Sequence, residues 1–344
     1  MKANKLALLS FGLSLLGAGA AIGQTATTEP VGFVSASVLA NSDATLAVPM
    51  NRTSVYKGVI QSITGNVVTV AGTSPAWVTS PMQFVQSLPA QPNTYAAQLA
   101  TGAKEGQIGR VTANGVNTLT ISFDAGDDLT GVKTEAVDGV GQGDHIDVMA
   151  YWTPKSLFTS PPLAAAILGF SNSGPGFDRG PADIFAFDGT NWQDDVNGGV
   201  VDHTPLPFGT SFVLRNNSAS VYNFSMVGSV PMTKFRVRLA TLAANTTQDI
   251  QIGYVCPIPE SLTALEFPAV AGDSILGFDN SEAGIDKGPL TIWAYDGTKW
   301  VDDVLGGDVP PTTMLQPGVG YIFRKNQTVA PQSVVWTHLP GYLQ

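Results

Sequence analysis

Residues 167–199 read ILGFSNSGPGFDRGPADIFAFDGTNWQDDVNGG, and residues 275–307 read ILGFDNSEAGIDKGPLTIWAYDGTKWVDDVLGG. The two stretches align without a gap at an offset of 108 residues, and 21 of the 33 positions are identical. Self-similarity at a fixed spacing indicates a fold that is built from copies of one unit. The shared residues are mainly Gly, Asp, Trp and alternating apolar residues, a set that describes a backbone shape rather than a catalytic centre.

The similarity continues outside these stretches. YWTPKSLF (151–158) aligns with VCPIPESL (255–262), SFVLRNN (211–217) with GYIFRKN (320–326), and MVGSVP (226–231) with VWTHLP (335–340). Pro154 and Pro259 favour a short helical turn in each copy, since proline suits the first helical position. A fainter similarity joins VLANSDATLAVPM (38–50) to TLAANTTQDIQIGYVCP (241–257), which predicts that the first copy is split and opens within residues 31–56.

The intervening segment has the pattern of a small barrel or sandwich. GVIQSITGNVVTVAG (58–72) and GRVTANGVNTLTISF (109–123) alternate apolar and polar residues around turns rich in Gly and Asn, which indicates two β-hairpins. Further short strands with Gly at the corners favour a compact all-β domain. Such an insertion is tolerated at an exposed turn whose two ends lie close together.

The expected fold class is therefore all-β, with a small β-barrel or sandwich domain and a tandem pair of homologous β-sandwich-like units. The expected divisions are a barrel-like domain at 31–150, repeat unit 1 at 151–233 and repeat unit 2 at 238–344. Residues 31–56 are alternatively part of repeat unit 1.

The amino-terminal sequence has the pattern of a cleavable secretory signal, expected at residues 1–23. Lys2 and Lys5 precede an apolar run at 6–16 and a small-residue stretch at 17–23, with cleavage expected after Gly23 or Ala26. The apolar run is shorter than the roughly 20 residues that a membrane-spanning helix needs. We therefore expect an exported protein, with no transmembrane helix in the mature chain.

Composition narrows the classes of partner. Only 13% of residues are charged and the formal net charge is −10, whereas nucleic acids and anionic membranes require a basic face. Cys256 is the single cysteine, so no disulfide can form within the chain. Secreted eukaryotic proteins of this size more often carry disulfides, which favours a bacterial source.

The sequence Asp-Gly-Thr-x-Trp occurs at 188–192 and again at 296–300. Asp begins a turn, Gly supplies a positive φ, and the aromatic residue before the turn can pair with the Trp after it. One interpretation places these rings in a hydrophobic core. The alternative is an exposed platform for a sugar ring, with Trp192, Trp293 and Trp300 as the candidate ligand-binding residues and Trp336 as a further aromatic for the same face.

Repeated carboxylates raise the question of a metal site. The candidate Ca²⁺ ligands are Asp188, Asp194, Asp195, Asp296, Asp302 and Asp303, with Asp178 and Asp286 at a second repeated position. Hard oxygen ligands in a Gly-rich loop suit Ca²⁺, although the spacing differs from that of an EF-hand. Acidic turn residues in solvent are the alternative, and a glycosidase pair is a further one. No cofactor is otherwise expected.

Nucleophilic catalysis has little support in the sequence. His145, His203 and His338 lie in unrelated contexts, and no nucleophile elbow or zinc-protease motif is present. Cys256 lies in an apolar strand context and is expected to be a small buried hydrophobe. Arg215 and Arg324 occupy equivalent positions and are expected to pair across strands with repeated acids.

Several stretches together resemble a secreted, β-rich family that occurs as many paralogues in Verrucomicrobia and related bacteria. These stretches are GFVSASVLANSDATLAVPMNR (32–52), GAKEGQIGRVTANGVNTLTI (102–121), DDLTGV (127–132), GDHIDVMAYWTP (143–154) and the two ILGF…DGTxW units. The resemblance spans nearly the whole mature chain. It implies export and carries no assigned activity, so it supplies no catalytic residues.

These observations predict an exported, non-catalytic protein of the cell surface, envelope or matrix that acts through strand-built faces. It is expected to reside in the periplasm, on the outer surface or outside the cell, with polysaccharide or other envelope proteins as its partners. The first alternative is a carbohydrate-binding module that uses the hairpin tryptophans. The second is a secreted hydrolase, which would gather histidine and carboxylates in one cleft between barrel and repeats.

Overall fold

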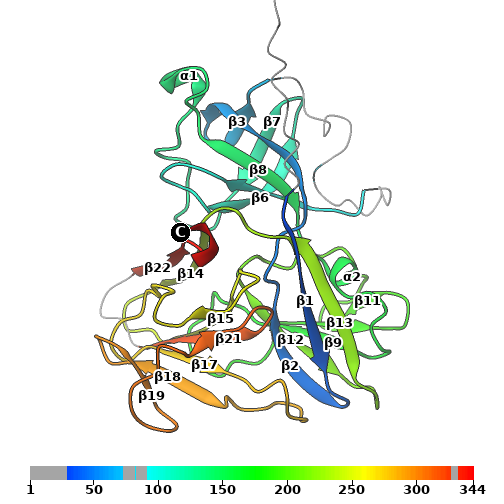
Figure 1. Cartoon of the computed structure of the whole chain (residues 1–344). Helices are drawn as coiled ribbons and strands as arrows, with labels where there is room; N and C mark the ends of the chain where they lie inside the picture. Colours follow the sequence, from blue (N-terminus) through cyan, green and yellow to red (C-terminus); the bar gives the residue numbers. More distant parts are fainter. Residues whose placement is uncertain (1–28, 73–81, 83–90, 327–331) are drawn as a thin grey trace, which may run out of the picture.

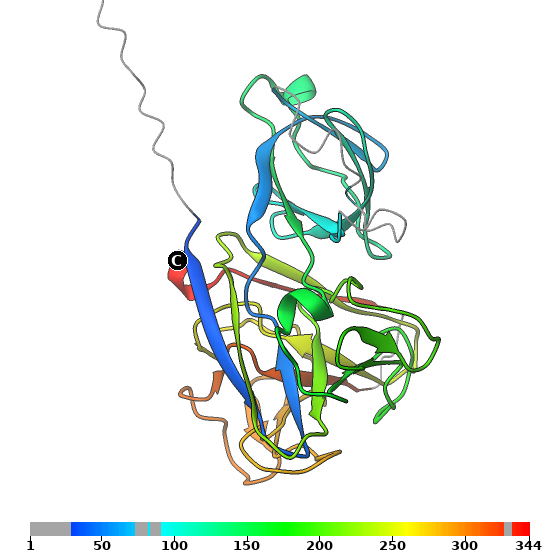
Figure 2. The same cartoon turned by 90° about the vertical axis from the view of Figure 1, so that its right-hand side faces the viewer.

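The computed structural model describes residues 29–72, 82, 91–326 and 332–344, and the expected signal sequence at 1–23 lies outside them. The regular secondary structure of the described chain is almost entirely β, as predicted (Figure 1). A closed barrel lies at one end, and two bodies built from sheets lie side by side below it (Figures 1 and 2).

The barrel is a ring of six antiparallel strands. Its closed order is β3-β4-β7-β6-β5-β8, and Figure 2 shows the ring nearly end-on. The strands are β3 (Ser54–Thr64), β4 (Val67–Val70), β5 (Tyr95–Leu99), β6 (Ile108–Asn114), β7 (Thr118–Ser122) and β8 (His145–Ala150), with the short helix α1 (Glu135–Asp138) before β8. Both predicted hairpins are confirmed, as β3 pairs with β4 and β6 with β7.

Two five-stranded sheets form the other bodies, and they have the same strand order. Sheet 1 has the order β11-β10-β9-β12-β2, and sheet 2 has the order β19-β18-β17-β21-β15. Sheet 1 contains β2 (Ser42–Ala47), β9 (Ala166–Gly169), β10 (Asp183–Phe187), β11 (Trp192–Asp194) and β12 (Ser211–Asn216). Sheet 2 contains β15 (Gln248–Gly253), β17 (Ser274–Gly277), β18 (Thr291–Tyr295), β19 (Trp300–Asp302) and β21 (Gly320–Lys325).

Each sheet packs against a two-stranded ribbon, and a hydrophobic core lies between them. Ribbon 1 pairs β1 (Val31–Val38) with β13 (Tyr222–Ser229), and ribbon 2 pairs β14 (Phe235–Leu242) with β22 (Gln332–His338). Phe224 and Met226 of ribbon 1 pack in one core with Leu214 of sheet 1, whereas Trp336 of ribbon 2 packs with Phe323 of sheet 2. A short 3-10 turn, η2 (Gly341–Leu343), follows ribbon 2.

Strands β1 and β2 belong to ribbon 1 and sheet 1, because they pair with β13 and β12. The barrel therefore begins at β3 rather than at residue 31, and the first copy is interrupted by it. The two ends of the interruption touch, since Trp152 Nε1 donates a hydrogen bond of 2.9 Å to the Met50 carbonyl. This contact is the geometry that an inserted domain requires.

The expected helical turns form in only one of the two places. Helix α2 (Pro154–Leu157) has proline at its start, and Thr153 caps it reciprocally with Ser156. At the equivalent place, β16 (Glu260–Ser261) pairs with β20 (Met314–Leu315) instead. Ile258 stands where the cap would be and has no hydroxyl to accept from the backbone, so the prediction of a second helical turn was wrong.

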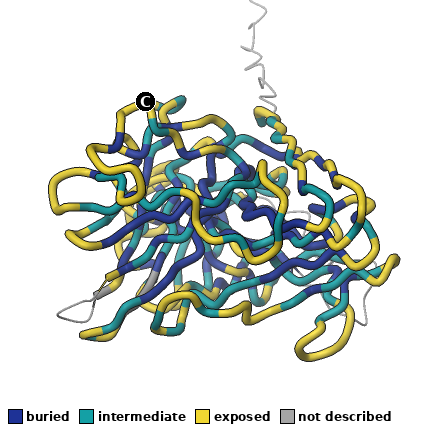
Figure 3. The backbone as a smooth tube through the Cα atoms, turned by 90° about the horizontal axis from the view of Figure 1, so that it is seen from below, coloured by how far each residue is buried: buried dark blue, intermediate teal, exposed yellow. Residues whose placement is uncertain are grey.

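The two sheets contact each other through their outer faces, near edge strands β2 and β15. Every residue of these two strands is buried, although each lies at the edge of its own sheet. Figure 3 shows buried backbone running through the middle of the molecule, with exposed stretches mainly at its periphery. Gly320 permits the close approach, because a Cβ there would lie 2.9 Å from both the Leu46 carbonyl oxygen and Thr45 Cγ2. Gly253 is equally confined, at 2.6 Å from the Thr210 carbonyl oxygen.

Candidate functional site

Two loops cross from one sheet to the other. Residues 170–181 follow β9 and reach the edge of β15, and residues 278–289 follow β17 and reach the edge of β2. Asn280 accepts from the Thr45 amide and donates to the Thr45 carbonyl, both at 2.9 Å. Asn172 makes the same pair with Gln251, at 2.8 and 3.1 Å. Each asparagine thus substitutes for a neighbouring strand, and each sheet completes the edge of the other.

An arginine of the opposite sheet binds each of the two crossing loops. Arg324 Nη2 lies 2.7 Å from Asp249 Oδ2 on the adjacent strand and 2.6 Å from Asp178 Oδ1 on the crossing loop. The hydrogen bond with Asp249 and, after it, the one with Asp178 raise the pKa of Arg324, against the opposing effect of burial. Arg324 thus pairs with a repeated acid, Asp178, as expected, but that acid lies on a loop of the other copy, and the cross-strand partner is Asp249 instead.

Arg215 forms the reciprocal cluster. Its Nε lies 2.8 Å from Asp43 Oδ1, and its Nη2 lies 2.5 Å from Asp286 Oδ1. The backbone amide of Asp286 also donates to Asp43 Oδ2, just as that of Asp178 donates to Asp249 Oδ2. In both clusters the arginine and its strand partner belong to one copy, and the loop carboxylate belongs to the other. Such reciprocal contacts are typical of two similar units that are related by an approximate two-fold axis.

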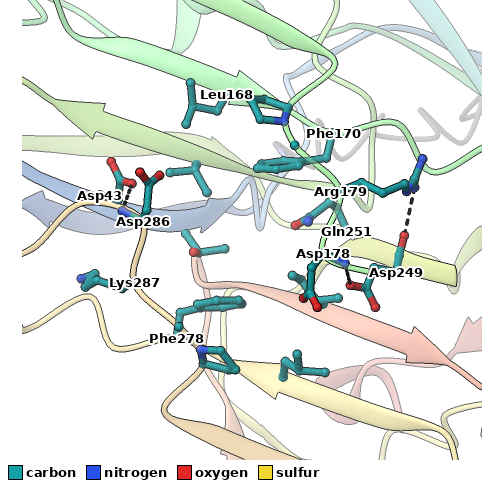
Figure 4. A pocket seen from close by; sticks show the side chains of 18 residues that line it. Asp43, Leu168, Phe170, Asp178, Arg179, Asp249, Gln251, Phe278, Asp286 and Lys287 are labelled. Carbon is teal, nitrogen blue, oxygen red and sulfur yellow. Dashed lines mark hydrogen bonds between the residues drawn. The ribbon is translucent and has the colours of Figure 1, made fainter. Parts of the chain in front are cut away.

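A pocket of about 360 Å³ lies between the two sheets on this approximate axis, and we call it the intersheet pocket (Figure 4). The residues that line it form nine pairs, one member from each copy. Its apolar wall consists of Leu168, Phe170 and Val213 together with their counterparts Leu276, Phe278 and Ile322. Figure 4 shows Phe170 and Phe278 on opposite sides of the space.

The crossing loops also contribute two cations to the pocket lining, Lys287 and Arg179, and both donate hydrogen bonds to backbone carbonyls. Lys287 Nζ donates to the carbonyls of Asp279 and Glu282, at 2.5 and 2.7 Å. Arg179 donates to the carbonyls of Ser171 and Asp249. Together with the two arginine clusters, these bonds give every charged side chain of the pocket lining at least one partner, although Arg179 Nε is buried and has none among the described residues.

The tryptophan candidates lie in the cores. Trp192 is 1% exposed, Trp300 6% and Trp293 9%, and Trp336 is fully buried. Trp192 packs 5.5 Å from Phe187 across its hairpin, and Trp300 packs 5.2 Å from Tyr295. Rings enclosed in this way cannot stack on a sugar. Their positions therefore agree with packing in a hydrophobic core and not with an exposed sugar platform.

The metal candidates cap turns. Asp188 and Asp296 accept from the two backbone amides that follow at positions 190–191 and 298–299, and Asp194 and Asp302 do the same in the next turn. The bond from the Asn191 amide is the main reason that the pKa of Asp188 is lowered. Asp195 and Asp303 sit one residue later, where their backbone amides donate to Ile184 and Ile292. Within the described residues, no three His, Cys, Asp or Glu side chains are placed to hold a metal ion.

The three histidines lie in separate parts of the molecule. His145 begins barrel strand β8, His203 lies in a loop of the first copy, and His338 is buried on β22 with Nε2 2.5 Å from Glu260 Oε2. Cys256 is buried in the core of the second copy, as expected, and burial raises the pKa of its thiol to about 12.

The junction between the barrel and the first copy is where a hydrolase cleft was expected. Its space of about 20 Å³ is lined by Glu29, Lys57 and Asp147 among others, and no histidine is part of that lining. Lys57 Nζ lies 2.9 Å from Glu29 Oε1 and 3.1 Å from Asp147 Oδ2. These side chains pair with one another, and the space that remains is about the size of one water molecule.

The outer faces of the two ribbons differ. On ribbon 2, Arg236 and Arg238 pair with Asp127 of the barrel, which covers that face. On ribbon 1, Val31, Phe33 and Val227 are 70%, 73% and 54% exposed. Phe33 lies directly opposite Val227 in the register, so these side chains form one apolar patch, the ribbon 1 patch.

Comparison with protein-family models, curated proteins and solved structures found no match for this chain. Among the described residues, no helix is sufficiently long and apolar to span a bilayer.

Two residues of the intersheet pocket, Asp178 and Asp286, were singled out from the sequence as candidate metal ligands, but the rest of its lining was not recognised as a site. Phe170 and Phe278, like Asn172 and Asn280, are among the identical positions of the two copies. The signal was therefore present, but it was interpreted as backbone maintenance. A phenylalanine directly after a strand, two residues beyond a leucine on the face away from the core and identical in both copies, is the feature that could have revealed the pocket.

Proposed function

We propose that the protein is exported and acts as a non-catalytic component of the cell surface, envelope or matrix. One observation carries the non-catalytic part. The repeated Asp, Arg and Asn side chains that could perform chemistry are instead bonded to turns and to the opposite sheet. Both copies keep these side chains because the side chains make the same structural contacts in each copy. A single active site would need only one set of such residues.

The basic, apolar and small-residue segments at positions 2–23 support export, and so does the resemblance to a secreted bacterial family. The ribbon 1 patch supports a protein partner within the envelope. Exposed apolar side chains that are contiguous on a strand-built face are typical of interaction surfaces. A polysaccharide would more often meet exposed aromatic platforms with polar groups, and the four buried tryptophans do not provide one.

Fractionation of a bacterium that expresses the full chain tests the export. The expected result is a shortened protein in the periplasmic, outer-membrane or medium fraction, beginning at Gln24 or Thr27 by mass spectrometry. A chain that keeps Met1 and remains in the cytoplasm would overturn the proposal. The non-catalytic part is tested separately, with polysaccharide, peptide and ester panels, and sustained turnover by the purified mature protein would refute it.

A further inference from the structure

We propose that the intersheet pocket binds one small, uncharged, apolar molecule per chain, with Phe170 and Phe278 on either side of it. A volume of about 360 Å³ lies in the range of pockets that enclose small molecules. Four of the six apolar wall residues, namely the two phenylalanines with Val213 and Ile322, are only partly buried and so keep surface available for contact.

The charges of the lining point to an uncharged ligand. Asp43 and Asp249 are both nearly buried and already bonded to arginine, and the exposed Asp178 and Asp286 are bonded to the same two guanidinium groups. Lys287 and Arg179 donate to backbone carbonyls. A cation would find each carboxylate already bonded to arginine, and an anion would have to compete with backbone carbonyls for Lys287 and Arg179. Either cost weakens binding.

The approximate two-fold arrangement fixes the stoichiometry. Each half of the pocket comes from a different sheet, and the halves face one space rather than two (Figure 4). One molecule must therefore contact equivalent residues of both copies. A site within each copy, such as a platform on each hairpin, would instead bind two molecules per chain.

Titration of the full mature chain with N-phenyl-1-naphthylamine, an uncharged fluorophore made of a naphthyl and a phenyl group, tests the proposal. We expect saturation at one molecule per chain. Phe170→Ala and Phe278→Ala should each raise the dissociation constant about tenfold, since each removes one apolar wall of the same ligand. The anionic relative 8-anilinonaphthalene-1-sulfonate should bind at least tenfold more weakly.

Two filling variants and one matched control locate the site. Val213→Trp and Ile322→Trp place an indole in the pocket from opposite sheets, and at least one that keeps a near-wild-type melting temperature should abolish binding. Phe33→Ala removes the most exposed ring of the ribbon 1 patch and should leave binding unchanged. Absence of binding by the wild type, saturation at two molecules, equal affinity for the sulfonate, or loss with Phe33→Ala instead of the filling variants would each overturn the proposal. None of these outcomes depends on where the cell delivers the protein.

Discussion

At the scale of the residue, the arginine clusters show how one side chain binds carboxylates from both copies. Arg324 binds Asp249, which is 6% exposed, and also reaches Asp178, whose side chain is 82% exposed. The nearly buried carboxylate depends on the guanidinium far more than the exposed one does, because it has lost most of its water. The energetic value of Arg324 therefore lies mainly in satisfying Asp249.

Arg324→Leu should lower the free energy of unfolding by about 3 kcal/mol, since it leaves the Asp249 carboxylate buried without its partner. Urea unfolding followed by tryptophan fluorescence measures this. Lys299→Met is the control, because Lys299 pairs with Asp308 on the surface and both side chains are more than half exposed. Equal losses in the two variants would contradict the buried role of Asp249.

Glu29 gives the junction of barrel and first copy a dependence on pH. Burial alone would raise its pKa, but hydrogen bonds from Ser229, Lys57 and Ser54 lower it from 4.5 to about 2. The folded state therefore keeps this carboxylate charged at a pH where the unfolded state has taken up a proton. Its contribution to stability is complete above about pH 4.5 and is lost as the pH falls toward 2.

Glu29→Gln should accordingly melt at a lower temperature than the wild type at pH 7, and the difference should shrink between about pH 4.5 and 2. Thermal unfolding by circular dichroism over this range is the measurement. A difference that stays constant down to pH 2 would show that the carboxylate is not held charged at the junction.

At the scale of the element, the crossing loops solve the problem of exposed sheet edges. β2 and β15 end their sheets, and an open edge is a template for pairing with another chain. Asn280 and Asn172 close these edges with side-chain amides, which donate and accept at once. The arrangement protects a buried strand without adding another strand.

Asn280→Ala should cost about 2 kcal/mol, because the Thr45 amide and carbonyl lose their partner in a buried place. Asn172→Ala should cost a similar amount through Gln251. Hydrogen exchange would show the loss of protection at the Thr45 amide alone in the first variant and at the Gln251 amide alone in the second. Asn197→Ala, on an exposed turn, is the control, and unchanged exchange at Thr45 in the Asn280 variant would contradict the capping role.

At the scale of the whole molecule, two sheets of the same order meet face to face, and the barrel covers the outer face of ribbon 2 but leaves that of ribbon 1 exposed. The contact between the sheets depends on the absence of side chains at Gly320 and Gly253. Where sheet 1 has Ser211, sheet 2 has Gly320, so the two faces are complementary rather than identical. The intersheet pocket is the space that this contact leaves beside it.

Gly320→Ala should destabilise the protein by about 2 kcal/mol, because the new methyl group overlaps Ser211 and crowds Leu46 and Thr45. Gly180→Ala is the matched control, since no atom lies within 4 Å of the added Cβ and its backbone is not left-handed. Differential scanning calorimetry of both variants is the check. A stable Gly320 variant would mean that the sheets separate easily and that their contact is weak.

Local patterns predicted the parts of this structure that local forces determine. The Asp-Gly turns, the barrel hairpins and the all-β class followed from alternation and turn chemistry. The sequence alignment of residues 226–231 with 335–340 is one residue out of register. It pairs exposed Val227 with buried Trp336, whereas the alternation of burial along the strands matches Met226 with Trp336. A shift of one residue exchanges the two faces of a strand.

Contacts between distant segments could not be predicted in this way. Thr45 and Asn280 are separated by 235 residues, and neither has a neighbour in the sequence that indicates the other. The burial of Trp192 and Trp300 likewise depends on ribbons and strands that come from other parts of the chain. The intersheet pocket, which needs both copies in place, is therefore a property that no single repeat contains.

The reciprocal crossing has a consequence for the order of synthesis. Strand β2 emerges from the ribosome early, yet the loop that closes its edge is made only after the barrel, the rest of the first copy and the opening strands β14–β17 of the second. Until then the nascent chain carries an unclosed edge, and an open edge can pair with another chain. The edge of β2 is thus closed only by a segment of the second copy, and a chain that terminates before that segment would be prone to aggregate.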